Sequence, residues 1–363
     1  MESQSTEHAA EPSKPDRPGD WRGIIARYQG SDIRKSLFQL VTTLVLLGTT
    51  LWLMHFMLAI AWWVTALLVI PAAGFLIKTF IIMHDCGHGS FLPWQKANDA
   101  IGFITGVMML TPYAQWRREH ALHHASSGDL DRRGVGDVST LTVREYVSLR
   151  RWGRFQYRLF RNPAVLLGLG PLHLMVFQRF RTRSVATGSA QLSSVWMTNI
   201  AIVALATIFI LAGGVKSVLF VYLPTFYLAA AVGIWLFYVQ HQFEEAYWES
   251  RKDWDYVTAA ITGSSYLRLP KVLQWFTGNI GLHHVHHLGP RIPNYRLQRA
   301  HDENPLFHEA PVMTFRRGLR AMRLALYDEA AHRLVRFSEI RGMARTPSTG
   351  ATISLLARRT GRE

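Results

Sequence analysis

The chain has 363 residues, of which 49% are hydrophobic, and its formal net charge is +15 at pH 7. Its single cysteine, Cys86, excludes an internal disulfide, an iron–sulfur cluster and a four-cysteine metal centre. A basic balance can indicate nucleic acid as a partner, but the Lys and Arg residues avoid two long apolar stretches, and membrane topology explains this distribution better than nucleic-acid binding does.

The amino-terminal segment, residues 1–35, is predicted to be a cytoplasmic tail. Its first twenty residues are rich in Glu, Ser, Pro and Asp and lack the basic-then-apolar pattern of a signal peptide, which favours disorder. We expect the apolar stretch that follows to act as the membrane-insertion signal.

This first apolar stretch runs from Ser36 to Ile77 without a Lys, Arg, Asp or Glu. A membrane-spanning helix needs about 20 residues, so the stretch is long enough to cross twice. We expect spans over residues 37–58 and 60–82, with a turn near Ala59. Lys78 falls in the last turn of the second span, where its long stem can reach the headgroups.

Two histidine clusters follow, separated by a short apolar stretch. The first is His84-Asp85-Cys86-Gly87-His88 and the second is His120-Ala121-Leu122-His123-His124. Residues three and four apart share one face of a helix, so each cluster presents its imidazoles together. The intervening stretch, residues 100–110, is too short to span and is expected to dip into the membrane or lie in its interface. Both clusters then lie on the same side.

The region from residue 129 to 183 is polar and rich in arginine. It predicts a surface helix over residues 144–160 and an apolar interfacial helix over 163–177 that is too short for a fifth span. The arginines fit either contact with anionic lipid headgroups or an ordinary solvated face, and both interpretations stay open.

A second apolar stretch runs from Gln191 to Gln240 with Lys216 as its only charged residue. It predicts spans over residues 195–211 and 218–239, broken at Gly213-Gly214. Nearly every other Lys and Arg falls in the amino-terminal segment, in residues 87–194 or in the carboxyl-terminal third, and the positive-inside rule places these regions in the cytoplasm.

A third histidine cluster, His283-His284-Val285-His286-His287, repeats the HxxHH spacing of the second. A rigid turn at residues 290–295 leads to amphipathic helices up to about residue 337, and residues 346–363 are predicted to be a disordered tail. The sequence therefore predicts an all-α integral membrane protein. Its membrane domain, residues 36–345, has four transmembrane helices in two hairpins and a cytoplasmic helical cap that carries the metal site.

Nine of the sixteen histidines lie in the three clusters, all on the predicted cytoplasmic side. A structural zinc ion takes four protein ligands and a catalytic one takes three, so these histidines are too many for one ion. We expect two ions that share them. Imidazole suits iron, copper, nickel and zinc alike, so the residues alone leave the metal open.

Over residues 75–326 the pattern resembles the membrane fatty acid desaturases, specifically the bacterial acyl-lipid type that is similar to the delta-12 enzymes. The resemblance rests on residues 84–91, on residues 116–124 followed by Gly128-Asp129-Leu130-Asp131, on residues 240–244, and on residues 279–282 with the third cluster.

The resemblance implies a non-haem di-iron centre that uses O2 and two external electrons to introduce a cis double bond into a lipid-linked acyl chain. It also implies a separate electron donor, either a ferredoxin or a small cytochrome with its reductase, and a place in the bacterial inner membrane with the metal site and both termini cytoplasmic. His284 fills a variable position and is left out of the ligand set. The implied iron ligands are His84, His88, His120, His123, His124, His241, His283, His286 and His287.

Polar residues near the clusters are candidates to hydrogen-bond the second ring nitrogen of a ligand histidine, and a solvated or capping role is the alternative for each. These candidates are Asp85, Glu119, Asp129, Asp137, Glu244 and Asn279.

Two other functions remain as alternatives. Carotenoid and alkane hydroxylases or ketolases use related histidine clusters, and they are the nearest enzymatic alternative. A membrane metal transporter is the alternative from another class. An ion pathway needs ionisable residues at mid-membrane depth, and the centres of the four predicted spans are almost entirely apolar.

Overall fold

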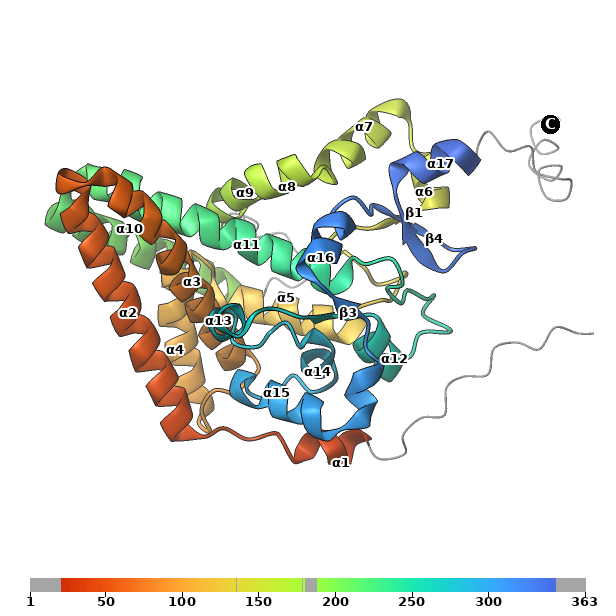
Figure 1. Cartoon of the computed structure of the whole chain (residues 1–363), viewed down its shortest axis with the longest axis horizontal. Helices are drawn as coiled ribbons and strands as arrows, with labels where there is room; N and C mark the ends of the chain where they lie inside the picture. Colours follow the sequence, from red (N-terminus) through yellow and green to blue (C-terminus); the bar gives the residue numbers. More distant parts are fainter. Residues whose placement is uncertain (1–20, 135, 178, 180–187, 344–363) are drawn as a thin grey trace, which may run out of the picture.

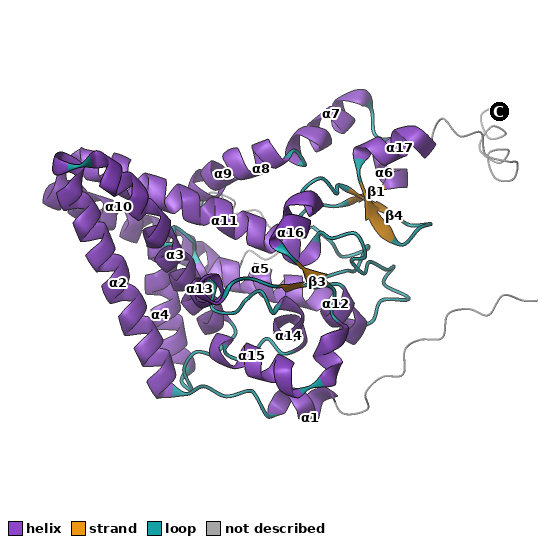
Figure 2. Ribbon diagram, in the orientation of Figure 1, coloured by secondary structure: helices purple, strands orange, loops and turns teal. Residues whose placement is uncertain are grey.

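The computed structural model describes residues 21–134, 136–177, 179 and 188–343. It is built mainly from helices, with a few short strands at one side (Figures 1 and 2). The predicted disorder of residues 1–20 and 346–363 falls outside the described residues.

The first apolar stretch forms two helices, α2 (Ile33–Ile60) and α3 (Trp62–Gly87), with the break at Ala61. Asp32 caps α2 by accepting hydrogen bonds from two backbone N–H groups of its first turn. Both helices are long and apolar enough to cross a membrane. Large apolar side chains such as Phe38 and Trp62, each 72% exposed, face outward, as expected for helices surrounded by lipid.

The second apolar stretch also forms a hairpin, made of α10 (Ser189–Ser217), a short π-helical turn η1 (Val218–Tyr222) and α11 (Leu223–His241). Gly214 has a φ of 73°, which interrupts the helix. The rings of Phe209 and Tyr222 lie 4.9 Å apart, whereas thirteen residues of straight helix would separate them by about 20 Å. The chain therefore reverses at the predicted break.

The turns of the two hairpins lie at the same end of the molecule. His55, near the end of α2, places its Nδ1 atom 2.6 Å from the hydroxyl of Ser217, which follows the break at Gly214. The opposite ends of α3 and α11 carry His84, His88 and His241. Both hairpins thus present their histidines at one end, as the predicted topology requires.

Between the hairpins lie α4 (Gln95–Met108) and α5 (Tyr113–Ser126), which are joined by a tight turn. The fourteen residues of α4 extend about 21 Å, less than a membrane core, so the prediction that this segment does not span is consistent with its length. The backbone N–H of Ala114 donates to the Ser194 hydroxyl at 3.2 Å, which holds α5 against the start of the second hairpin.

The arginine-rich region forms four short helices rather than two. They are α6 (Val143–Ser148), α7 (Arg151–Phe160), α8 (Pro163–Gly168) and α9 (Gly170–Val176). The axis bends by 54° between α7 and the α8–α9 pair. In Figure 1, α7, α8 and α9 form an arm along one side of the molecule, whereas α6 lies beside the strands that pair near residues 141 and 326. The helices α8 and α9 pack on α11.

The remaining helices form the cap. They are α1 (Trp21–Ala26), α12 (Tyr256–Thr262), α13 (Lys271–Phe276), α14 (His283–Leu288), α15 (Asn294–Glu303), the 3-10 helix η2 (Pro305–Glu309), α16 (Phe315–Ala321) and α17 (Phe337–Met343). Ile25 of α1 is buried in one cluster with Val285 and Leu288 of α14. Residues 21–26 are therefore part of the cap, and the predicted tail is shorter than 35 residues.

Two small sheets complete the cap. β1 (Leu141–Thr142) pairs with β4 (Leu326–Asp328), which also pairs with β5 (Arg333–Val335), and β2 (Tyr266–Leu267) pairs with β3 (Val312–Met313). The prediction of amphipathic helices up to residue 337 is therefore wrong beyond α16. The reason is that β4 buries all three of its residues between two partner strands, which a one-sided helical pattern does not describe.

Candidate metal centre

Four helices deliver all nine predicted ligands to one place. His84 lies in the last turn of α3 and His88 caps that helix, while His120, His123 and His124 lie on α5. His241 is the last residue of α11, and α14 consists almost entirely of the third cluster. The convergence depends on both hairpins ending at this side.

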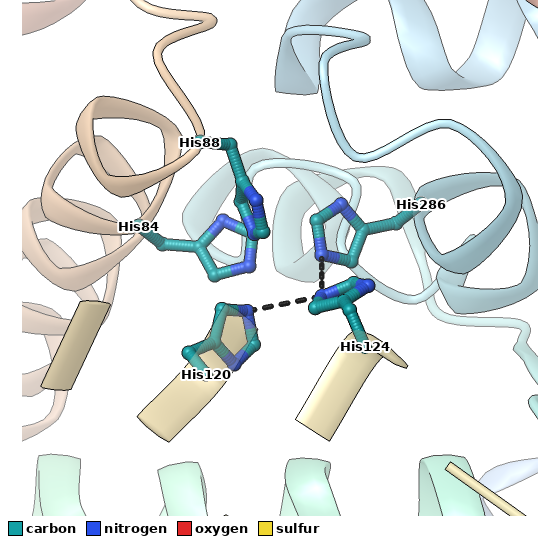
Figure 3. Close-up of side chains that lie close together, drawn as sticks. All are labelled: His84, His88, His120, His124 and His286. Carbon is teal, nitrogen blue, oxygen red and sulfur yellow. Dashed lines mark hydrogen bonds between the residues drawn. The ribbon is translucent and has the colours of Figure 1, made fainter. Parts of the chain in front are cut away.

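The nine histidines divide into two groups. In each group, one side-chain nitrogen per residue lies within 4.8 Å of those of the others. The larger group is shown in Figure 3, where the five rings point toward a common centre. It contains His84, His88, His120, His124 and His286, and the smaller group contains His123, His241, His283 and His287.

The two HxxHH clusters contribute to both groups in a reciprocal way. On α5, the residues four apart, His120 and His124, belong to the larger group, and His123 belongs to the smaller. On α14 the assignment is reversed, since His283 and His287 join the smaller group and His286 joins the larger. Around a helix axis, residues four apart differ by about 40°, so they point in nearly the same direction. Consecutive residues differ by about 100°, so His123 points away from His124, and His286 points away from His287.

The nitrogens in each group lie at close distances. The Nε2 atom of His124 is 3.1 Å from that of His120 and 3.0 Å from that of His286. In the smaller group, the Nε2 atom of His241 is 3.2 Å from that of His123 and 2.9 Å from that of His283. Aligned imidazole nitrogens of this kind form a ready set of metal ligands.

Burial keeps these imidazoles in the form that binds metal. It lowers the pKa of the histidines outside the spans well below the ordinary value, and the neighbouring histidines lower it further. Neutral imidazole is the ligand form, because a proton and a metal ion compete for the same lone pair. The residues so affected are His88, His120, His124, His283, His286 and His287.

One of the unpartnered nitrogens also fits a metal site. The buried Nε2 atom of His88 has no hydrogen-bond partner among the described residues, and the same holds for Nδ1 of His124 and of His283. A buried polar atom without a partner costs free energy unless something binds it. A metal ion at the centre of the larger group would engage the Nε2 atom of His88, whereas His124 and His283 turn Nε2, and not the unpartnered Nδ1, toward the other histidines of their groups.

Two of the six polar candidates lie against a clustered histidine. Asp85 places its Oδ1 atom 3.2 Å from Nδ1 of His84, and the Asp137 carboxylate contacts Nδ1 of His123. Both carboxylates are nearly buried. An acceptor at Nδ1 fixes the tautomer in which Nε2 carries the free lone pair.

The contacts of the other four candidates include arginines, a glutamine and a backbone carbonyl. The Asp129 carboxylate accepts a hydrogen bond from Arg132, and the Glu244 carboxylate accepts one from Arg333 at 3.0 Å. In each pair the arginine also neutralises the charge of the carboxylate. Asn279 donates to the backbone carbonyl of Asn294, and Glu119 accepts from Gln115. Of these four, Glu119 lines the cavity described below beside His120.

His284 belongs to neither group. It is fully buried, and its Nε2 atom lies 3.1 Å from Nδ1 of His301. Burial lowers the pKa of His284 to about 3. His284 therefore lies outside both groups, and its exclusion from the metal ligands stays a prediction.

Asn294 is a residue of this region that sequence reasoning missed. Its side-chain NH2 group and its backbone N–H both donate to Oδ2 of Asp85, at 2.8 and 2.9 Å. Its side-chain oxygen, Oδ1, accepts a hydrogen bond from the side chain of Gln39. Asn294 begins α15, more than two hundred residues after Asp85, so no local pattern could connect them.

We expect Asn294→Ala to reduce metal affinity by about 10-fold, because the Asp85 carboxylate loses a hydrogen bond that orients it toward His84. The measurement is the iron content of the purified variant after dialysis against a graded series of chelator concentrations. Gln298→Ala is the matched control, because Gln298 is a half-buried residue of the same helix whose side chain donates to Asp302. An equal loss in both variants would contradict this role for Asn294.

An apolar cavity of about 330 Å³ reaches the metal centre. Its walls come mainly from α3, α5, α8, α9 and α11, and three clustered histidines, His84, His120 and His283, lie in its lining. The apolar part includes Ile77, Phe80, Ile81, Trp116, Leu166, Leu174, Phe226, Ala229, Ala230, Gly233, Ile234 and Phe237.

Two neighbouring aromatic residues of α13 are not part of this lining. The rings of Trp275 and Phe276 pack on Phe75, at 6.1 and 5.2 Å between centroids. Lys78 is 4% exposed and lies over the Trp275 ring while donating to its backbone carbonyl at 2.8 Å. Its predicted reach toward the headgroups is therefore wrong, because α13 offers it a closer partner.

Comparisons with known proteins agree with this geometry. A family model described as fatty acid desaturase matches residues 60–317. A protein of Bacillus subtilis named fatty acid desaturase is 41% identical over 317 residues, which cover 87% of this chain and 90% of that protein. An sn-1 oleoyl-lipid 12-desaturase of Anabaena variabilis is 27% identical and covers 74% of the chain and 75% of its own length. An sn-1 acyl-lipid omega-3 desaturase (ferredoxin) of Synechocystis is 27% identical over 61% of the chain and 62% of its own length. The chain belongs to the fatty acid desaturase family.

Proposed function

We propose that the chain introduces a cis double bond into a lipid-linked acyl chain, using O2 and two iron ions held by the nine histidines. The observation that carries this proposal is the apolar cavity that ends on His84, His120 and His283. A channel lined by aliphatic and aromatic side chains suits a hydrocarbon chain. Because the channel also reaches three of the proposed metal ligands, methylene groups inside it would lie next to the metals.

The two irons, when bound, would supply the oxidant that removes one hydrogen atom from each of two neighbouring methylene groups. Overall, the reaction consumes one O2, two electrons and two protons, and it releases two water molecules for each double bond. The residues of the chain position and protect the reacting groups. Phe80 and Trp116 form apolar walls next to His84 and His120, which excludes bulk water from the reacting carbons.

The electrons come from a separate protein in this proposal, because one cysteine cannot hold an iron–sulfur centre. The name of the Synechocystis relative includes ferredoxin, and a ferredoxin or a small cytochrome with its reductase would supply the electrons here. In this proposal the metal centre, both termini and the basic surface lie on the cytoplasmic side of a bacterial inner membrane, and the distribution of Lys and Arg supports this orientation. An acidic donor would suit this basic surface.

The proposal is tested by the fatty-acid profile of bacteria that express the chain. Methyl esters are analysed by gas chromatography and mass spectrometry, with the His120→Ala variant as control. We expect a new cis-unsaturated acid with the wild type and none with the variant. Polar hydroxylated or ketone products in place of unsaturated acids would overturn desaturation in favour of a hydroxylase or ketolase with the same histidine clusters.

A further inference from the structure

One face of α11 forms a continuous side of the cavity. Phe226, Ala229, Ala230, Gly233, Ile234, Leu236, Phe237, Tyr238 and Gln240 all line it. Most of these positions recur at intervals of three or four residues, as expected for one face of a helix. The middle of this face carries the small residues Ala229, Ala230 and Gly233 beside Ile234, and the larger Phe226 and Phe237 flank them.

Gly233 has no packing reason to be a glycine. A Cβ atom added there would meet no atom within 4 Å, whereas one added at Gly170 would lie 2.8 Å from the side chain of Ile234, and one at Gly74 would lie 2.6 Å from Phe276. Gly233 also has ordinary helical backbone geometry, because α11 continues through it. Glycine in a helix interior is less favourable than alanine, so the empty space at Gly233 calls for another explanation.

The empty space lies inside the cavity and near its middle. Gly233 is seven residues from Gln240, at the histidine end, and seven from Phe226, at the far end, which corresponds to about 10 Å in each direction along the helix. An extended chain of tetrahedral atoms advances about 1.2 Å per bond, so about eight carbon atoms fit between the metal end and the level of Gly233.

The walls near Gly233 are fixed by helix contacts. The Tyr227 hydroxyl donates to the backbone carbonyl of Gly168 at 2.8 Å, which ties α8 to α11. The close approach of Gly170 to Ile234 holds the start of α9 against the next residue along α11. A side chain added at position 233 would therefore project into the cavity, because the opposite helices are held in place.

We propose that Gly233 keeps the cavity open to the part of the acyl chain that lies farthest from the metals, and so sets the length of chain that the enzyme accepts. The proposal rests on the function proposed above. A larger side chain would divide the cavity, shutting out carbons beyond about eight from the reaction site while leaving the histidine end unchanged.

The test is a graded series, Gly233→Ala, Gly233→Val and Gly233→Leu, with Gly48→Leu as the matched control. Gly48 lies in α2, is exposed, and has no atom within 4 Å of an added Cβ. We measure conversion of 14-carbon and 18-carbon acyl chains, together with bound iron. The ratio of 18-carbon to 14-carbon conversion is expected to fall progressively and by at least 10-fold in Gly233→Leu, with iron content unchanged in every variant. Gly48→Leu should keep the wild-type ratio.

A second readout needs no turnover. Lysophospholipids with 14-carbon and 18-carbon chains are added to purified protein and the shift in melting temperature is recorded. Gly233→Leu should lose the stabilisation by the 18-carbon probe and keep that by the 14-carbon probe. A constant conversion ratio across the series, or an equal loss of stabilisation by both probes, would overturn the role of Gly233. An absence of unsaturated product from the wild type, with the binding difference intact, would overturn the proposed reaction and leave the length assignment standing.

Discussion

Replacing His286 or His241 with alanine is expected to abolish product formation, because each removes a ligand from a different group of histidines. His286 belongs to the group of five and His241 to the group of four. His241→Ala leaves three imidazoles in the group of four, whereas His286→Ala leaves four in the group of five. Iron should therefore fall by about one ion per chain in His241→Ala and by less in His286→Ala. The measurements are product yield and iron content of the purified variants.

His284→Ala is the matched control, since His284 lies on α14 between two clustered histidines and is just as buried. This variant should keep its iron and most of its activity, because its ring faces His301 and belongs to neither group. Insertion in the membrane should be similar for all three variants. Equal loss of iron from His284→Ala and His286→Ala would contradict the ligand assignment.

Removing the Asp137 carboxylate is expected to have the next largest effect. Asp137 contacts Nδ1 of His123, a residue of the smaller group, and it comes from a loop rather than from the same helix. Carboxylates that orient metal-bound histidines are worth about 10- to 100-fold in metal affinity or activity. Asp137→Ala should lose affinity within that range, and Asp137→Asn should lose less because the amide oxygen still accepts from Nδ1. Chelator titration of bound iron separates the two variants.

Asp99→Ala provides the comparison for Asp137. Asp99 is also a carboxylate in a hydrogen-bond network, but its partners are Arg117 and the Tyr113 hydroxyl, and it is about half exposed. Its loss should leave metal affinity unchanged. If Asp99→Ala and Asp137→Ala weaken iron binding to the same degree, the contact with His123 does not orient the ligand.

The sequence was sufficient for features that depend on local chemistry. The charge-free stretch from Ser36 to Ile77 and the nearly charge-free one from Gln191 to Gln240 identify apolar helices by length alone, and Gly214 marks the reversal because glycine tolerates a positive φ. The three histidine clusters contain eight of the nine histidines that the structure brings together, and the ninth, His241, was expected from its position at the end of the fourth predicted span and from the family resemblance. Strands of two or three residues, such as β1, give no periodic signal and were missed.

The division of the histidines needed both local and tertiary structure. The sequence predicted that each HxxHH cluster aims its imidazoles in one direction. In the structure, His123 separates from His120 and His124 because it points to another side of α5, where α11 presents His241. Helix geometry allows this separation, but the tertiary position of α14, which packs on α12, α15 and β2, determines which residues complete each group.

The sequence by itself determined the membrane helices, the position of the second reversal and the identity of the clustered histidines, because each follows from hydrophobicity, backbone freedom or spacing along one helix. The tertiary structure decided the two groups of histidines, the support of Asp85 by Asn294 and the cavity beside Gly233. These features join residues far apart in the chain. Their physical basis is contact between packed helices, which no local pattern encodes.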